Sequence, residues 1–263
     1  MLYQRVLTGI IGGPGILALV YLGGAWFTGL ISFLGIVGFS EFLRMKGYRY
    51  FEIPSLAGFL LTLIWILFGA EWLHSKEAAL LWVVYGFLLL TVGMKNRFTF
   101  RDISYILVGT IYIGLSLHYV LKLRGLPDGL WLVLFVLFSI WATDIAAYFV
   151  GKAVRGPKIW PSISPNKTVS GTIGGVAAAA LVGIAYSLFL GTDHPIQQWI
   201  VGAMAISVAG QIGDFVESGL KRSLDVKDSG EIIPGHGGVL DRFDSLLFAA
   251  PIAYYLLVLV FDF

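Results

Sequence analysis

Two aspartates and one polar run interrupt otherwise apolar sequence in the second half of the chain. Asp144 lies within LFSIWATDIAAYFVG, and Asp214 lies within VAGQIGDFVESGLKRS. The run PGHGGVLDRFD, residues 234–244, combines one histidine, one arginine and two aspartates with three glycines. A carboxylate inside an apolar span is costly unless it faces a wet cavity or a cation. These residues therefore indicate a chemical site and not a passive part of a scaffold.

Helical spacing places further polar groups beside these acids. If the helix around Asp214 continues into the next loop, Glu217 and Lys221 follow at i+3 and i+7 on the same face. Asp241 and Asp244 likewise lie three residues apart. Three helix ends thus bring carboxylates to one membrane depth. Such oxygen-only ligands suit Mg²⁺, which usually joins one or two carboxylates to a substrate phosphate.

The acids also have structural explanations. An aspartate near the end of a span often caps a helix or lies at the membrane interface, and this alternative stays open for Asp244. Asp144 lies deeper in its span, where a functional explanation is favoured. Basic residues crowd the same loops as Asp214 and Asp241, which favours a functional role for both. Glu217 is instead expected to be solvated or to hold neighbouring side chains.

The loop around the last acids has the composition of a phosphate-binding site. Glycine lets backbone amides approach an anion closely, so the run PGHGG predicts a nest of N–H donors at Gly235, Gly237 and Gly238. Lysine and arginine side chains nearby would bind phosphoryl oxygens. These basic residues are Lys221, Arg222, Lys227 and Arg242. His236 is open to three roles, as a base, a phosphate donor or a turn residue.

A second loop supplies polar side chains just ahead of a helix start, which is itself an anion-binding position. Its sequence SISPNKTVSG provides Ser162, Ser164, Asn166, Lys167, Thr168 and Ser170. Such a segment is also a good turn sequence on its own. The glycines Gly171, Gly174 and Gly175 are expected to permit close helix packing and not to contact a ligand. The prediction of a phosphate site therefore rests on the convergence of acids, bases and amides.

The composition places these residues in a membrane protein. The chain is 57% hydrophobic and 13% charged, with a mean hydropathy of +0.84, outside the range of soluble globular domains. A net charge of +2 without blocks of lysine and arginine argues against a nucleic-acid partner. With no cysteine, the chain has no disulfide, thiolate metal site or cysteine nucleophile. The first apolar run lacks a cleavage site ahead of a soluble domain, so it is expected to be retained.

Nine apolar runs approach the length of about 20 residues that a helix needs to cross a bilayer core. They lie near residues 5–22, 24–43, 54–71, 78–94, 103–121, 130–151, 171–190, 197–215 and 244–262. The sequence thus predicts an all-α polytopic membrane protein with about nine transmembrane helices. Residues 1–71 form the amino-terminal scaffold and residues 72–129 the middle helices in this interpretation. Residues 130–263 carry the catalytic helices and loops.

Charge asymmetry between the loops predicts the orientation. If nine spans alternate across the membrane, all but Lys76, Lys122 and Arg124 of the 18 basic residues fall on one side. The positive-inside rule then places the amino terminus in the cytoplasm and the carboxyl terminus outside. Two long polar loops, residues 152–170 and 216–243, lie on the cytoplasmic side in this arrangement. Because long structured loops commonly carry function, the working face is expected to be cytoplasmic.

The run SGLKRSLDVKDSGEIIPGHGGVLDRFDS, residues 218–245, resembles the signature of the phosphatidate cytidylyltransferases, also called CDP-diacylglycerol synthases. The shared pattern is Ser-x-apolar-Lys-Arg, four residues, Lys-Asp-x-Gly, then Pro-Gly-His-Gly-Gly-apolar-x-Asp-Arg-x-Asp. The SPNKTVSG loop and the Asp144 helix also resemble the family, so the similarity covers roughly residues 140–250. It implies a Mg²⁺-dependent reaction in which CTP and phosphatidic acid give CDP-diacylglycerol and pyrophosphate.

The resemblance also implies roles for the candidate residues. Asp214 and Asp241 would bind Mg²⁺, with a second cation as an option, and Asp144 would line the same cavity as a further ligand. A phosphate monoester is already ionised near neutral pH, so His236 would contact phosphate and not act as a base. The basic residues that would hold the polyphosphate and the lipid headgroup are Lys167, Lys221, Arg222, Lys227 and Arg242. Further substrate-binding positions in the signature are Ser218, Asp228 and Asp244.

Two other classes of function remain as alternatives. An ion-coupled transporter would use intramembrane aspartates as an ion path, although here the acids cluster at one face and no inverted repeat is visible. Another nucleotide-dependent lipid enzyme, such as a polyprenol kinase, would transfer the γ-phosphoryl group instead. Compactness and the lack of a targeting segment favour a bacterial plasma membrane. Aromatic and glycine-rich faces on the early spans permit a homodimer.

Overall fold

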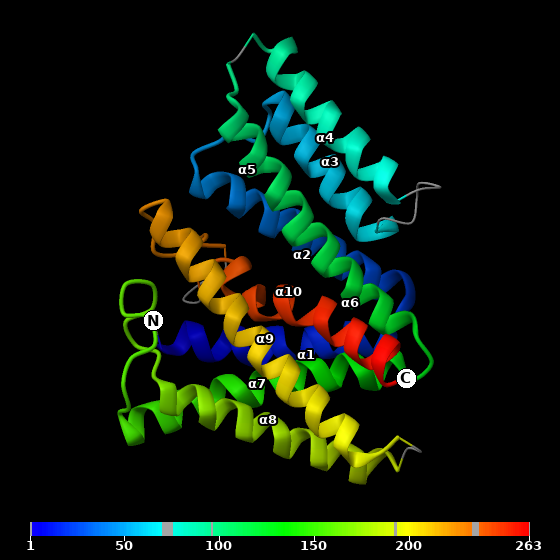
Figure 1. Cartoon of the computed structure of the whole chain (residues 1–263), viewed down its shortest axis with the longest axis vertical. Coiled ribbons are helices and arrows are strands. Elements are labelled where there is room, and N and C mark those ends of the chain that lie inside the picture. The colour runs from blue at the N-terminus through cyan, green and yellow to red at the C-terminus, as the bar shows by residue number, and fades with distance from the viewer. Residues whose placement is uncertain (1, 70–75, 96, 192–193, 233–236, 263) are drawn as a thin grey trace. The chain divides into compact units, whose positions relative to one another are not determined.

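The computed structural model describes residues 2–69, 76–95, 97–191, 194–232 and 237–262, and in these ranges every regular element is a helix apart from isolated bridge residues such as the Lys158–Thr168 pair. The elements follow one another along the chain in Figure 1. They are α1 Leu2–Leu22, α2 Gly24–Met45, α3 Ile53–Phe68, α4 Lys76–Gly93, α5 Phe100–Thr110, η1 Ile111–Leu115, α6 Ser116–Gly125, α7 Gly129–Val154, α8 Val169–Leu190, α9 Ile196–Ser223, α10 Leu240–Tyr254 and η2 Tyr255–Val260. The all-α prediction is confirmed for this part of the chain.

Six helical segments in the described ranges are long and apolar enough to cross a membrane. They are Gly24–Met45, Phe100–Gly125, Gly129–Val154, Val169–Leu190, Ile196–Ser223 and Leu240–Val260. Three shorter apolar helices, Gly12–Leu22, Ile53–Phe68 and Leu80–Gly93, occupy the other predicted spans. The chain is therefore a multi-pass membrane protein by length and composition. The count of nine spans and the orientation of the termini stay predictions.

The helices pack into two compact units. The first comprises residues 1–121 and 228–241, and the second comprises residues 122–227 and 242–263. This division follows packing, whereas the predicted parts 1–71, 72–129 and 130–263 describe roles along the chain, so it does not test them. The described residues 228–232 and 237–241 belong to the first unit and carry part of the predicted signature into it.

In the second unit, α7 packs along α8, and α9 contacts both helices (Figure 1). Glycines allow this close approach, because a Cβ on Gly174 would lie 2.7 Å from the Val150 side chain. A Cβ on Gly175 would lie 2.9 Å from the Thr143 side chain, and one on Gly171 would lie 2.7 Å from the Ala147 carbonyl oxygen. The prediction that these glycines serve helix packing is confirmed.

Buried polar contacts join α7 to α9 within this unit. The Thr143 hydroxyl lies 2.8 Å from Ser207 Oγ and 2.7 Å from the Ser139 carbonyl oxygen, and its single proton is donated to one of them at a time. Gln211 Nε2 donates to the same Ser207 hydroxyl at 3.3 Å. Hydrogen bonds between helices fix their register when apolar packing alone leaves it loose. These contacts, at Ser207 and Gln211, fix the part of α9 that directly precedes Asp214.

The two polar loops are shorter than predicted because the helices continue past the apolar runs. The α7 helix extends to Val154, α9 to Ser223, and α10 begins at Leu240. Hydropathy marks where the membrane ends, whereas a helix continues into water as long as its backbone hydrogen bonds do. With 28 residues, α9 is about 42 Å long, against a bilayer core of about 30 Å. Its last turns therefore carry polar residues out of the apolar layer.

Candidate active site

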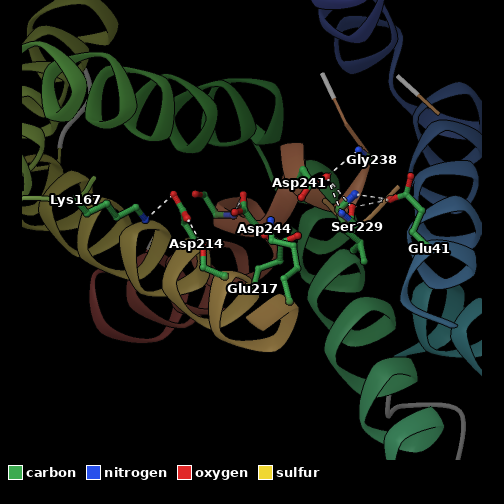
Figure 2. Close-up of polar contacts among 12 residues, drawn as sticks. Glu41, Lys167, Asp214, Glu217, Ser229, Gly238, Asp241 and Asp244 are labelled. Carbon is green, nitrogen blue, oxygen red and sulfur yellow. Dashed lines mark hydrogen bonds and ion pairs between the residues drawn. The ribbon is translucent and has the colours of Figure 1, made fainter. Parts of the chain in front are cut away.

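Asp214 is paired with Lys167 near the end of α9. Lys167 Nζ lies 2.6 Å from Asp214 Oδ2, and the Ser218 hydroxyl donates to Asp214 Oδ1 at 3.3 Å (Figure 2). The Lys167 ammonium also lies 4.2 Å from the centroid of the Phe215 ring. The carboxylate thus faces a cation and a hydroxyl that were both predicted from sequence to bind substrate.

A short ribbon of backbone hydrogen bonds presents Lys167. The Ile159 N–H donates to the Lys167 carbonyl at 3.3 Å, and the Val169 N–H donates to the Pro157 carbonyl at 2.9 Å. Trp160 packs edge-on against Phe215, with 5.0 Å between ring centroids. The loop between α7 and α8 is therefore held by hydrogen bonds and ring packing. It places Lys167 beside Asp214, which lies 47 positions later in the chain.

Thr168 in this loop has a structural task. Its side chain accepts from the Gly171 N–H at 3.1 Å and thereby caps α8. Thr168 is buried, whereas Ser162 and Asn166 are exposed and Ser164 is half-buried. A substrate contact for these four residues stays a prediction.

Two further carboxylates gather with Asp214 in the second unit. Asp144, on α7, interacts electrostatically with Asp214, Lys167 and Arg242. Asp244, on α10, interacts with Asp214 and Asp144, and its Oδ1 accepts from the Ser245 N–H at 2.7 Å. Asp144, Asp214 and Asp244 form what we call the acid cluster, supplied by α7, α9 and α10. The choice between a structural and a functional role for Asp244, left open by the sequence, stays a prediction.

Lys221 is largely buried and forms an ion pair with Glu217, one turn earlier on α9. Its Nζ lies 2.5 Å from Glu217 Oε2, and the two side chains are 12% and 2% exposed. The prediction that Glu217 is solvated is wrong, and the alternative that it holds a neighbouring side chain is confirmed. Because a buried carboxylate is costly without a cation, this pair fixes the position of both groups. The other predicted basic residues, Arg222, Lys227 and Arg242, are exposed.

In the first unit, Asp241 organises the segment 228–241. Its Oδ2 accepts from the Ser229 N–H at 3.0 Å, the Ser229 hydroxyl at 3.0 Å and the Gly238 N–H at 2.8 Å (Figure 2). Gly237 has a φ of +81°, and a Cβ there would lie 2.7 Å from the same oxygen. The Gly238 amide, which was predicted to bind an anion, thus donates to a carboxylate of the chain itself. Asp228 is exposed, and Gly235 and His236 lie outside the described residues.

Sequence analysis missed Glu41, which lies on α2 in the presumed scaffold. Glu41 is 1% exposed and accepts from the Val239 N–H and the Leu240 N–H, each at 2.9 Å (Figure 2). The Ser229 hydroxyl lies 3.3 Å from Glu41 Oε2. The available signal was a single acid in the apolar run IVGFSEFLRM, because a lone intramembrane carboxylate indicates a function or a partner.

Comparison with known proteins gives the same family along nearly the whole chain. The model of the cytidylyltransferase family matches residues 3–260. The phosphatidate cytidylyltransferase of Bacillus subtilis (strain 168) is 43% identical over 263 residues, covering 97% of each chain. The phosphatidate cytidylyltransferase of Staphylococcus haemolyticus (strain JCSC1435) is 36% identical over 258 residues, covering 97% of this chain and 98% of that protein. The chain belongs to the cytidylyltransferase family. Membership extends the resemblance from residues 140–250 to the amino-terminal helices, which contain Glu41.

Mg²⁺, which the resemblance implies for a cytidylyltransferase, fits the chemistry of the acid cluster. All three donors are carboxylates, the ligand type that hard divalent cations prefer, and one of them is paired with the Lys167 ammonium. Among the described residues, no three carboxylate or histidine groups lie close enough together to hold a metal ion by themselves. Binding of Mg²⁺ at this site therefore stays a prediction.

Proposed function

We propose that this protein is a phosphatidate cytidylyltransferase, which converts CTP and phosphatidic acid to CDP-diacylglycerol and pyrophosphate. The observation that carries the proposal is the 43% identity with the Bacillus subtilis phosphatidate cytidylyltransferase over 97% of both chains. The acid cluster and its basic surroundings supply the chemistry that two anionic substrates require. Apolar helices supply the membrane setting that a lipid substrate requires.

The reaction is an in-line displacement at phosphorus. An oxygen of the phosphatidate monoester forms a bond to the α-phosphorus of CTP while the bond from that phosphorus to the α,β-bridging oxygen breaks. The electron pair leaves with pyrophosphate. Because the attacking phosphate is already ionised near neutral pH, the chain needs to hold and neutralise the phosphates and does not need a strong base.

Asp144 and Asp214 are proposed to bind Mg²⁺ with Asp241, and a second cation is compatible with this number of acids. Asp241 lies one helical turn before Asp244 on α10, so the helix that supplies the acid cluster also carries Asp241. Bound Mg²⁺ would supply charge neutralisation at the triphosphate and at the departing pyrophosphate.

Basic side chains are proposed to bind the phosphates directly. Lys167 would exchange Asp214 for a phosphoryl oxygen when substrate arrives, since a doubly charged phosphate attracts an ammonium more strongly than one carboxylate does. The other proposed phosphate-binding side chains are Lys221, Arg222, Lys227, His236 and Arg242. Polar groups proposed to line the substrate site are Ser162, Ser164, Asn166, Thr168, Ser218, Asp228, Asp244 and the amides of Gly235, Gly237 and Gly238.

The setting is proposed to be a bacterial plasma membrane, with the active site on the cytoplasmic side. The relatives come from bacteria, and the asymmetry of lysine and arginine between alternate loops supports this orientation. CTP is a cytoplasmic nucleotide, so a cytoplasmic site also matches the supply of substrate. Assembly as a homodimer stays part of the proposal, on the aromatic and glycine-rich faces of the early helices.

Two labels on CTP distinguish this reaction from that of a lipid kinase. Purified protein in detergent is given phosphatidic acid, Mg²⁺ and CTP that carries ³²P at either the α or the γ position. A cytidylyltransferase places the α label in the lipid product and releases the γ label as pyrophosphate. Appearance of the γ label in lipid would support a kinase, and label in neither lipid pool would contradict both enzymes.

A further inference from the structure

The Glu41 carboxylate accepts hydrogen bonds from backbone amides that are far from it in sequence. Its Oε1 accepts from the Val239 N–H, and its Oε2 accepts from the Leu240 N–H, at 2.9 Å in both cases. Leu240 is the first residue of α10 and Val239 directly precedes it, where backbone N–H groups have no partner within the helix. A carboxylate from α2 therefore caps a helix that begins almost 200 residues later, and it meets the positive end of that helix dipole.

The same carboxylate reaches the other end of the segment. The Ser229 hydroxyl lies 3.3 Å from Glu41 Oε2 and 3.0 Å from Asp241 Oδ2. A hydroxyl carries one proton and donates to one of these carboxylates at a time. Ser229 therefore links Glu41 to Asp241, while its backbone N–H stays on Asp241 at 3.0 Å.

Two glycines make room for Glu41 in this arrangement. A Cβ on Gly230 would lie 2.5 Å from Glu41 Oε1, and one on Gly238 would lie 2.6 Å from Oε2. Both positions belong to the predicted signature, where glycine was interpreted as a means of exposing amides to phosphate. Around Glu41, these glycines instead admit a buried carboxylate against the backbone, which gives them a second reason to lack a side chain.

We propose that Glu41 is a positioning residue for the reaction: it ties Ser229 to the amides of Val239 and Leu240 and thereby fixes the orientation of Asp241. This role rests on the proposed cytidylyltransferase function, in which Asp241 binds the metal. Glu41 acts through these hydrogen bonds. The α2 helix thus positions a residue of the signature, beyond its use as scaffold.

Glutamine at position 41 is the sharpest test, because it keeps the shape of the side chain and replaces one acceptor oxygen by an NH₂ donor. That donor would face one of the two backbone N–H groups, so one of these bonds cannot form. Glu52→Gln is the matched control, since Glu52 belongs to the same unit, is not buried, and its side chain accepts from the Arg49 N–H at 3.3 Å.

Amide hydrogen exchange measures the hydrogen bonds from Val239 and Leu240 to Glu41 directly, and it does not depend on enzymatic activity. In Glu41→Gln, peptides that contain Val239 and Leu240 should exchange about tenfold faster or more than in the unaltered protein, and Glu52→Gln should match the unaltered protein. Unchanged exchange at these amides in Glu41→Gln would overturn the proposal.

Steady-state kinetics then test whether the loss of these hydrogen bonds impairs the role of Asp241 in the reaction. Per folded molecule, kcat for CTP and phosphatidic acid should fall about tenfold or more in Glu41→Gln relative to the control, in addition to any loss of melting temperature from the broken hydrogen bond. A purely structural glutamate would lower the melting temperature and the folded yield but leave kcat per folded molecule unchanged, and that result would also overturn the proposal. If the unaltered protein itself shows no turnover, the proposed function fails, and hydrogen exchange still decides the role of Glu41 in holding these amides.

Ser229→Ala covers the case in which Glu41→Gln does not fold. It removes the hydroxyl between the two carboxylates and leaves the Ser229 N–H and the Glu41 bonds to α10 in place. We expect a severalfold loss of kcat per folded molecule, with unchanged exchange at Val239 and Leu240. A kcat equal to that of the unaltered protein would contradict the proposal.

Discussion

At the scale of single residues, an ion pair neutralises part of the acid cluster. Lys167 Nζ lies 2.6 Å from Asp214 Oδ2, which lowers the cost of holding several carboxylates together. In the proposed function, the Lys167 ammonium would exchange this carboxylate for a phosphoryl oxygen of CTP.

Replacement of Lys167 by methionine tests this interpretation. The variant keeps an unbranched side chain but loses the ammonium that lies 4.2 Å from the Phe215 centroid and pairs with Asp214. It therefore also loses one charge-assisted contact to phosphate, so kcat/KM for CTP should fall by about 10-fold to 100-fold. Lys152→Met is the control, because Lys152 is exposed on the last turn of α7 and lies over Tyr148. Steady-state kinetics at varied CTP measure both variants. Equal values for Lys167→Met and Lys152→Met would refute a phosphate contact.

Sequence patterns predict the acids better than their partners. Asp144 and Asp214 could be found because each interrupts an apolar run, and Asp241 because it lies in a glycine-rich signature. Glu41 could not be assigned, since no spacing rule relates position 41 to amides at 239 and 240. Contacts between distant segments depend on how helices pack, and a single sequence does not encode that in a local pattern.

At the scale of elements, glycine positions set the distance between the helices that carry the site. A Cβ added to Gly183 on α8 would lie 2.6 Å from the Trp199 carbonyl oxygen and 2.8 Å from Ile200 Cα, both on α9. Backbone atoms cannot move aside as a flexible side chain does. The α8–α9 contact therefore requires glycine at this position.

Gly183→Ala should destabilise the protein by about 1–3 kcal/mol, because α8 and α9 must separate to admit the methyl group. Thermal unfolding in detergent measures the loss. In the control Gly86→Ala, a Cβ meets no atom within 4 Å, so its stability should stay the same or rise with the better helix propensity of alanine. An unchanged melting temperature for Gly183→Ala would show that the contact is looser than the structure indicates.

Apolar runs locate the helices well and their ends poorly. Each of the nine runs corresponds to one described helix or to two or three consecutive helical elements, yet α7 and α9 extend by three and eight residues beyond the predicted ends at 151 and 215. The extension of α9 is what places Glu217 and Lys221 on the face of Asp214. Hydropathy could not predict it, because polar residues outside the bilayer continue a helix without any apolar signal.

At the scale of the whole molecule, the proposed orientation makes a direct prediction about access from outside the cell. The chain has no cysteine, so a single introduced cysteine is a unique label site. Pro127 lies in an exposed loop that is predicted to be external, and Ser223 lies at the exposed end of α9, which is predicted to be cytoplasmic. The two variants are Pro127→Cys and Ser223→Cys. An impermeant maleimide should label the first in intact cells and the second only after permeabilisation. The opposite pattern would reverse the orientation.

The central claim is that this protein transfers a cytidylyl group to phosphatidic acid with carboxylates of the acid cluster. The most direct measurement is pyrophosphate release by the purified protein with CTP and Mg²⁺, with and without phosphatidic acid, for the unaltered protein, Asp214→Asn and the exposed control Asp128→Asn. We predict release that depends on the lipid, falls by about 100-fold or more in Asp214→Asn, and is unaffected in Asp128→Asn. Release without lipid, or equal release by Asp214→Asn and the unaltered protein, would contradict the account.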